Sequence, residues 1–295
     1  MVGYEAAGMM AAPLHDLLLA IVAPFPPAAL AGGVVGLSLG LTGGGGAIFA
    51  VPLLVYGLGV EPRTAVSISL VTVAATAMVG AVERARYGQV ELSTGLLFAA
   101  AGMVATPLGS WLGTLLPDSF LLASFAVLML LIAARMWIKA SDPSERASPA
   151  ALDAGSGPAC RRDPEGKLRM TSRCASILLM TGLAVGLLSG LFGVGGGFLI
   201  VPALVTFASM GVPRAVGTSL FVMTLVGVAG VASQMAAGRT VPLDIAGGFV
   251  TGSIPGLLAG SFLGRRLTGP LLSKLFSVAI MLVAAFIIVK TLLGI

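Results

Sequence analysis

Residues 186–202 read Gly-Leu-Leu-Ser-Gly-Leu-Phe-Gly-Val-Gly-Gly-Gly-Phe-Leu-Ile-Val-Pro, and residues 36–52 read Gly-Leu-Ser-Leu-Gly-Leu-Thr-Gly-Gly-Gly-Gly-Ala-Ile-Phe-Ala-Val-Pro. Both stretches place glycines and a final Val-Pro pair at the same relative positions. The same offset continues downstream, where Ala-Val and Ser-Leu pairs recur in residues 65–70 and 215–220. Motifs kept in the same order over this distance indicate an internal repeat.

Outward from these stretches, the chain is strongly apolar. It has 295 residues, of which 57% are hydrophobic and 10% are charged, whereas a soluble domain needs far more charge to cover its surface. Four stretches without any charge are long enough to cross a bilayer; they are residues 64–82, 92–116, 215–237 and 245–264. The sequence therefore predicts a multi-pass integral membrane protein.

The repeat and the hydropathy together predict an all-α integral membrane protein with two homologous repeats of five helical segments. The expected parts are an N-terminal segment (1–27), a first transmembrane repeat (28–138), a hydrophilic linker (139–174) and a second transmembrane repeat (175–295). Each repeat begins with two short helices separated by a glycine break; they are residues 28–42 with 46–60, and 175–192 with 196–210. Three longer segments follow in each repeat.

The charge pattern sets the expected orientation. A net charge of +5 could suggest nucleic acid, but the basic residues lie at the ends of apolar segments and in the linker, as in membrane proteins. We therefore expect no nucleic-acid partner and a cytoplasmic linker. Five segments per repeat would invert the second copy and bring one set of basic residues to the cytoplasm; these are Arg84, Arg86, Arg265, Arg266 and Lys274. This predicts an inverted repeat in the inner membrane of a prokaryote, with both termini outside.

The glycine breaks are the strongest candidates for a substrate site. Non-helical backbone at membrane depth is tolerated only where protein or a watery cavity satisfies its polar groups, and paired broken helices point to a transporter's midplane site. A helix N-terminus presents free N–H groups that favour an anion. The candidate donors are the backbone N–H groups of Gly44, Gly45, Gly46, Gly195, Gly196 and Gly197. The alternative is that these glycines only permit close helix packing.

Hydroxyl groups at matched places in the two repeats are the next candidates. Ser67 and Ser69 lie near the start of one charge-free segment, and Thr218 and Ser219 lie near the start of another. They could donate to an oxyanion without burying a charge. Equally, they could bond to their own helix or to a neighbouring one. Gln234 could be a further donor, although a packing role is favoured.

Other polar residues have weaker claims. Arg63 and Arg214 each follow a proline and could attract anions at a vestibule, or anchor the helix at the interface. Cys160 and Cys174 do not indicate a disulfide framework.

Several classes of function lack the residues they need. Neither glycine cluster is followed by the lysine of a phosphate-binding loop, which argues against an ATP-driven pump. No carboxylate lies in the middle of a predicted segment, so a proton relay through a buried acid is not indicated. A single histidine and two cysteines cannot build a metal centre. We therefore expect no cofactor, no metal and no enzymatic activity.

The doubled Gly-x-Gly-Gly-Gly-x-x-x-x-Pro element, clearest in residues 193–202, resembles the sulfite exporter TauE/SafE family of membrane permeases, and Ala-Val-Gly-Thr-Ser-Leu at 215–220 supports this resemblance. The first copy departs from the pattern, with Thr42, Gly44 and Ala47 where the second has Phe192, Val194 and Gly197, and with Ser67-Ile68-Ser69 for Gly217-Thr218-Ser219. The resemblance implies transport of sulfite, organosulfonates or related small sulfur-containing anions across a prokaryotic cytoplasmic membrane.

From the residues and the resemblance together, we expect a secondary transporter, more specifically an exporter. Its partners would be a small anion and the lipid bilayer, and a homodimer is compatible with the sequence. An anion channel with the same pore chemistry is the main alternative, and a membrane scaffold is a third.

Overall fold

The computed structural model describes residues 26–141, 161–162, 168–169, 172–208, 210–239, 241–264 and 269–293. Most of the predicted N-terminal segment and most of the predicted linker, including Cys160, lie outside these residues, as do Arg265 and Arg266. The elements are α2 (Pro26–Thr42), η1 (Gly45–Phe49), α3 (Ala50–Pro52), η2 (Leu53–Gly57), α4 (Pro62–Arg86), α5 (Leu92–Leu115), α6 (Asp118–Ser141), β1 (Arg161–Arg162), β2 (Leu168–Arg169), α8 (Ser172–Phe192), α9 (Gly197–Phe207), α10 (Val212–Ala236), α11 (Leu243–Gly264) and α12 (Gly269–Leu293).

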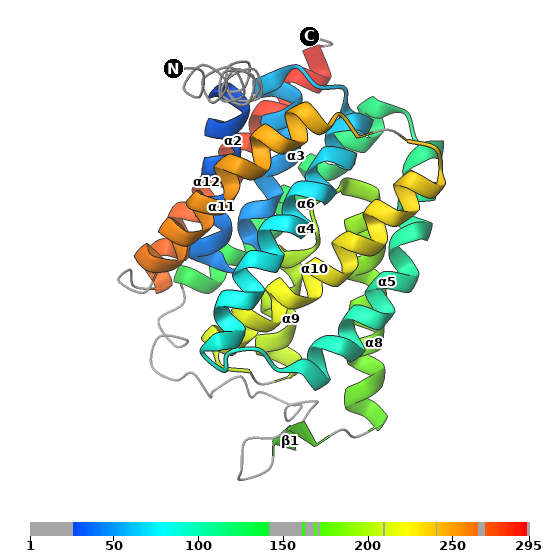
Figure 1. The fold of residues 1–295 in the computed structure, drawn as a ribbon. Coiled ribbons are helices and arrows are strands. Elements are labelled where there is room, and N and C mark those ends of the chain that lie inside the picture. The colour runs from blue at the N-terminus through cyan, green and yellow to red at the C-terminus, as the bar shows by residue number, and fades with distance from the viewer. Residues whose placement is uncertain are drawn as a thin grey trace, which may run out of the picture.

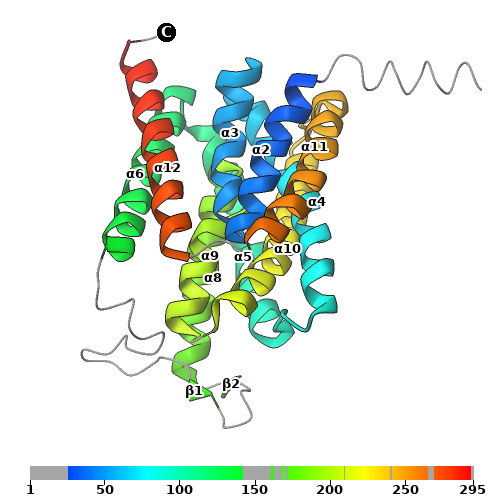
Figure 2. The same ribbon diagram turned by 90° about the vertical axis from the view of Figure 1, so that its left-hand side faces the viewer.

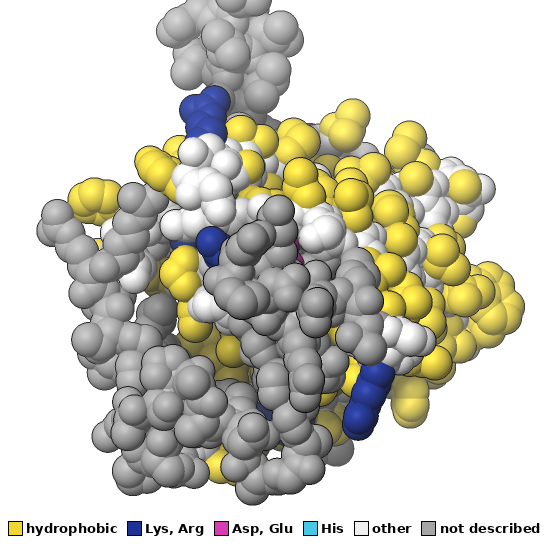
Figure 3. Space-filling model, turned by 90° about the horizontal axis from the view of Figure 1, so that it is seen from below, with side chains coloured by type: hydrophobic (Ala, Val, Ile, Leu, Met, Phe, Trp, Pro, Cys, Tyr) yellow, Lys and Arg dark blue, Asp and Glu magenta, His cyan; other side chains and the backbone are white. Residues whose placement is uncertain are grey.

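Within the described residues, six helices are long and apolar enough to cross a membrane: α4, α5, α6, α8, α10 and α11. Large apolar side chains point outward from them, such as Trp111, Leu131 and Phe262, each more than half exposed. In water such a surface would be unfavourable, but it suits contact with lipid tails. Figure 3, a view from below, shows hydrophobic side chains over much of the coloured surface. The prediction of a multi-pass helical membrane protein is confirmed.

Both glycine clusters interrupt the helical chain as predicted. α2 ends at Thr42 and α8 ends at Phe192, and in each case a short loop follows before the chain turns back. The return segments differ from each other: α9 is a regular helix, whereas the first return is wound as the 3₁₀ turn η1, the short α3 and the wide π turn η2. A single short helix over residues 46–60 was therefore too simple a prediction.

Four helix pairs build the molecule. α2 packs on α11 and α5 packs on α8, in both cases running in the same direction, while α4 packs on α10 and α6 packs on α12. The first two pairs are in backbone contact through glycines: a Cβ on Gly36 would overlap the Ser253 carbonyl oxygen, and one on Gly186 would overlap that of Gly102. Small residues allow this close approach in membranes. Figures 1 and 2 show α2 beside α11 and α5 beside α8.

The start of α2 and the end of α12 lie at one end of the molecule, and β1 lies at the opposite end (Figures 1 and 2). The end that carries β1 and the start of α8 is called the linker end below. β1 and β2 form a short antiparallel pair there. Cys174, buried near the start of α8, is disulfide-bonded, a bond that the two cysteines of the sequence did not indicate.

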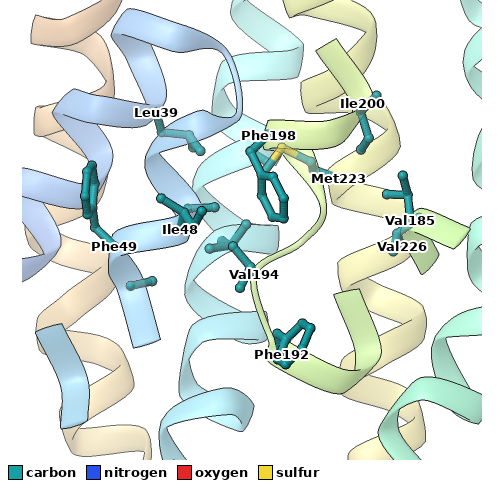
Figure 4. Packing of buried hydrophobic residues seen from close by; sticks show 14 of the residues in the cluster. Leu39, Ile48, Phe49, Val185, Phe192, Val194, Phe198, Ile200, Met223 and Val226 are labelled. Carbon is teal, nitrogen blue, oxygen red and sulfur yellow. The ribbon is translucent and has the colours of Figure 1, made fainter. Parts of the chain in front are cut away.

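The buried core surrounds the two glycine breaks. Ile48 from the first return segment, Val194 from the second break, Phe198 from α9 and Met223 from α10 all belong to one cluster of buried hydrophobic residues. Figure 4 shows these side chains between the two broken hairpins. The polar backbone of both breaks is therefore enclosed by apolar side chains.

Candidate functional site

The two break loops meet at the centre of the molecule. Gly44 in the first loop lies against Gly197 in the second: a Cβ on Gly44 would lie 2.6 Å from the Gly197 carbonyl oxygen. Gly195 lies against Val73 and Met223, residues halfway along α4 and α10. The six glycines predicted as donors, at 44–46 and 195–197, are all buried and lie in or directly after these loops.

The two breaks are held by an exchanged pair of hydrogen bonds. The Ser69 hydroxyl donates to the Gly193 carbonyl at 2.7 Å, and the Ser219 hydroxyl donates to the Gly43 carbonyl at 2.5 Å. Ser69 corresponds to Ser219 in the sequence repeat, and Gly43 corresponds to Gly193, so each copy binds the break of the other. Gly43 and Gly193 have φ of 73° and 70°, a left-handed conformation that suits glycine.

The other two predicted hydroxyls also have protein partners. Ser67 donates to the Arg63 carbonyl in its own helix at 3.3 Å. Thr218 accepts a hydrogen bond from the N–H of Glu91 at 3.0 Å, which ties α10 to the start of α5. In the arrangement described here, all four hydroxyls are thus engaged within the protein. Of the four, Ser69 and Ser219 contact a break directly.

The N–H groups of the breaks differ in their partners. The Gly46 N–H donates to the Thr42 hydroxyl at 3.2 Å, so the first break is partly closed by its own side chain. Gly196 caps the N-terminus of α9 and, as a glycine, has no side chain to accept from the first N–H groups of that helix. Among the described residues, the N–H groups of Gly44, Gly195 and Gly196 donate no hydrogen bond. Buried N–H groups of this kind are rare and call for a partner.

A partly polar recess opens near the linker end. It has a volume of about 320 Å³, and its polar lining includes the side chains of Arg84 and Gln89, which are hydrogen-bonded to each other at 2.9 Å. At the opposite end of the molecule, the Arg239 guanidinium donates to the side-chain oxygen of Gln234 at 2.8 Å. In this second pair the glutamine comes first in the chain and the arginine second, the reverse of Arg84 and Gln89. Each end of the molecule therefore carries a guanidinium held by an amide, close to the end of α4 or of α10.

A larger groove of about 620 Å³ lies between α12 and the first broken hairpin. Its lining is almost wholly apolar and includes Phe49, Tyr56, Phe276 and Phe286. Such a lining offers an anion few donors, so this groove is not our candidate for the substrate site.

The two arginines considered for a vestibule have different environments. The Arg63 guanidinium forms an ion pair with Asp118 at 2.9 Å and donates to the Leu116 carbonyl at 3.1 Å. It thereby joins the start of α4 to the turn between α5 and α6, which is the anchoring alternative. Arg214 is exposed near the start of α10, at the linker end.

The two arginine–glutamine pairs were not singled out from the sequence. Arg84 was treated only as a loop charge, and Gln89 and Arg239 were given no role. The offset of the repeat aligns Arg84 with Gln234 and Gln89 with Arg239, and this exchange of residue types could have identified the pairs. Gln234 is buried, and its Nε2 has no hydrogen-bond partner in the described part of the chain. No cluster of metal-binding side chains occurs among the described residues.

A multi-pass helical bundle with two broken hairpins meeting at its centre is the architecture of a membrane transporter, and the comparisons with known proteins agree. The model of the sulfite exporter TauE/SafE family matches residues 28–287, so the chain belongs to this family. A protein of Xylella fastidiosa (strain Temecula1) named "Probable membrane transporter protein" is 35% identical over 262 residues, which cover 87% of this chain and 92% of that protein. "Probable membrane transporter protein YunE" of Bacillus subtilis is 27% identical, with 83% of this chain and 88% of that protein covered. No solved structure is significantly similar to this chain.

Proposed function

We propose that this membrane transporter carries sulfite or a related small sulfur-containing anion, and that the anion binds where the two glycine breaks meet. The observation that carries the proposal is the set of buried N–H groups at Gly44, Gly195 and Gly196 that have no acceptor among the described residues. An oxyanion supplies several acceptor oxygens to such donors. The family's name supports a sulfur oxyanion as substrate.

The remaining predicted site residues surround these donors. Gly45, Gly46 and Gly197 continue the two break loops into the return segments. Ser69 and Ser219 contact the two breaks directly, and Ser67 and Thr218 are buried on the same two helices, α4 and α10. We propose that Ser69 and Ser219 exchange their carbonyl acceptors for an anion oxygen when the breaks move apart. In the closed arrangement these two hydroxyls hold the breaks together.

We further propose that the two repeats, 28–138 and 175–295, are inverted relative to each other. Supporting this, α2 enters from the end where α12 finishes, while α8 enters from the linker end (Figure 2). Corresponding hydrogen bonds also recur with the copies exchanged. Two opposed hairpins that meet at a central site would allow access from each side in turn.

For orientation, we propose that the linker end faces the cytoplasm of a prokaryotic inner membrane and that both termini lie outside. More basic than acidic side chains lie at the linker end of the described helices: Arg84, Arg86, Arg135, Arg173, Arg214 and Lys274. Figure 3 views the molecule from this end, where several Lys and Arg side chains are in sight. Cytoplasmic surfaces of membrane proteins carry such an excess. Alkaline phosphatase fused after the C-terminus should be active in a Gram-negative host, and an inactive, fully translated fusion would reverse the assignment.

The direct test of the function is uptake of radiolabelled sulfite into proteoliposomes, with sulfate and taurine as competitors. Saturable uptake that exceeds that of empty vesicles, and counterflow driven by internal sulfite, are the expected results. Uptake without counterflow and proportional to voltage would indicate a channel instead. No uptake of sulfite or of any sulfonate by protein with a cooperative melting transition would refute the proposal.

A further inference from the structure

The buried serines and threonines of this protein are almost all hydrogen-bonded, and Ser189 in α8 is the exception. Its side chain is 1% exposed, and its hydroxyl oxygen has no hydrogen-bond partner. Among the described buried serines and threonines, Ser189 alone has this property. A helical serine normally donates to a carbonyl in the preceding turn, as Ser38 does to the Val34 carbonyl at 2.8 Å.

Ser189 lies directly beside the second break. A Cβ built on Gly196 would lie 3.8 Å from the Ser189 Cβ, so the side chain of Ser189 and the N-terminus of α9 are neighbours. Gly196 caps α9, an 11-residue helix, without any side-chain hydrogen bond. The unpartnered hydroxyl and the unpartnered N–H groups of Gly195 and Gly196 therefore occur together.

The first break lacks this combination. Leu39 stands at the position that corresponds to Ser189 and has no polar group to offer. Thr42, which corresponds to Phe192, accepts a hydrogen bond from Gly46 and donates to the Ser38 carbonyl at 2.7 Å. The first break thus satisfies part of its own polar groups, whereas the second leaves a hydroxyl and helix N–H groups open.

We propose that the second break is the anion-binding half-site and that Ser189 is a substrate-binding residue, donating its hydroxyl to an oxygen of a small oxyanion. The N–H groups of Gly195 and Gly196 bind the same anion together with that of Gly44, and the rest of the first break serves as structural support. This inference rests on the proposed function, since it names the half of that site which supplies most of the contacts to the anion. It also assigns the contact to a residue outside the predicted set.

The neighbouring side chains allow an anion to enter with limited rearrangement. Met223 passes beside Gly195 and Gly197, with its Cε 3.4 Å from the Cβ position of Gly195. A methionine side chain is unbranched and adapts to its surroundings more readily than other apolar residues. Displacing it would open the break towards α10 without moving the backbone.

The test compares Ser189→Ala with Ser277→Ala in sulfite uptake by proteoliposomes. Ser277 is an equally buried helical serine, but its hydroxyl donates to the Lys274 carbonyl at 2.8 Å in α12, outside the site. Removal of a hydrogen bond to a charged ligand should raise the sulfite concentration for half-maximal uptake on the order of ten- to a hundredfold. Ser277→Ala should keep the wild-type value. Equal values for Ser189→Ala and wild type would overturn the inference while leaving the proposed function intact.

A binding measurement covers the case in which the protein carries no sulfite flux. The melting temperature of the purified protein would be followed against sodium sulfite and sodium sulfate, with sodium chloride at equal ionic strength as the reference. Stabilisation by an oxyanion that is lost in Ser189→Ala and kept in Ser277→Ala supports the half-site even without transport. Absence of stabilisation in the wild type, together with absence of flux, refutes both the half-site and the proposed function.

Discussion

Replacing Gly186 by alanine should destabilise the protein by forcing α8 away from α5. The new Cβ would lie 2.6 Å from the Gly102 Cα and 2.7 Å from its carbonyl carbon, whereas unstrained carbon atoms approach to about 3.5–4.0 Å. The two helices would have to separate by roughly 1 Å at this point. Overpacking of this kind typically costs about 1–3 kcal/mol. The higher helix propensity of alanine returns up to about 1 kcal/mol of it.

The matched control is Gly247→Ala in α11. Gly247 is also a helical glycine, but it is exposed, and a Cβ there would meet nothing within 4 Å. Because the propensity gain is common to both variants, the difference between them isolates the steric cost of about 1–3 kcal/mol. For a chain of this size that corresponds to a difference in melting temperature of about 2–12 °C. It can be measured in detergent by circular dichroism. Equal melting temperatures for the two variants would refute the close backbone contact between α5 and α8.

Three further changes have defined outcomes. Ser69→Ala and Ser219→Ala should each lower stability by about 1–3 kcal/mol in the same melts, because each leaves a buried break carbonyl without its donor; wild-type melting would contradict the exchanged hydrogen bonds. Arg63→Gln should change stability by less than about 1 kcal/mol, because its ion pair is partly exposed, and should leave sulfite uptake unchanged; a large loss of uptake would restore its vestibule role. Arg84→Gln should slow anion uptake from the linker side, and adding Gln89→Arg should restore it by rebuilding the pair in the order found at the other end; no rescue would argue against an electrostatic role.

The glycine clusters carried most of what could be predicted about the fold. They placed both breaks correctly, because consecutive glycines weaken a helix and adopt the left-handed backbone that ends it. The ends of α2 and α8 lie at the predicted residues Thr42 and Phe192. The helix lengths could be predicted from the runs without charge. The irregular winding of the first return segment could not be predicted, because Pro52 and Pro202 occupy matched positions but only the second return segment is a regular helix.

Which helix faces which could not be derived from the chain alone. The spacing of glycines at 32, 36 and 40, and again at 182, 186 and 190, shows that one face of each helix lacks side chains and allows close packing. It does not say that the partner is the fourth segment of the other copy. The hydroxyls illustrate the same limit: Ser69 and Ser219 could be placed near the breaks, but their acceptors lie far away in sequence and depend on the pairing of α4 with α10. Ser189 was overlooked because an unpartnered hydroxyl is visible only once its neighbours are known.

The helix pairing indicates that the units that move during transport are not the two sequence copies. α2 and α4 pack with α11 from the second copy, while α8 and α10 pack with α5 from the first. Each broken hairpin is thus in backbone contact with a helix of the other copy, so the two sequence copies cannot move apart without separating α2 from α11 and α5 from α8. We therefore expect two mixed units, which move relative to each other at the contact between α4 and α10.

Disulfide cross-linking distinguishes the mixed units from the sequence copies. In protein with both native cysteines replaced by alanine, a Leu191→Cys/Gly113→Cys pair would join α8 to α5 inside one unit, since a Cβ on Gly113 lies 3.5 Å from the Leu191 carbonyl oxygen. An Ala74→Cys/Gly227→Cys pair would join α4 to α10 between the units, since a Cβ on Gly227 lies 2.7 Å from that of Ala74. Both pairs are within reach of a disulfide after small adjustments. Oxidation should stop sulfite uptake reversibly in the second variant and spare it in the first, because only the second link crosses the moving contact. If the link between α5 and α8 blocks uptake and the link between α4 and α10 does not, the copies move as the sequence divides them, and the mixed units are wrong.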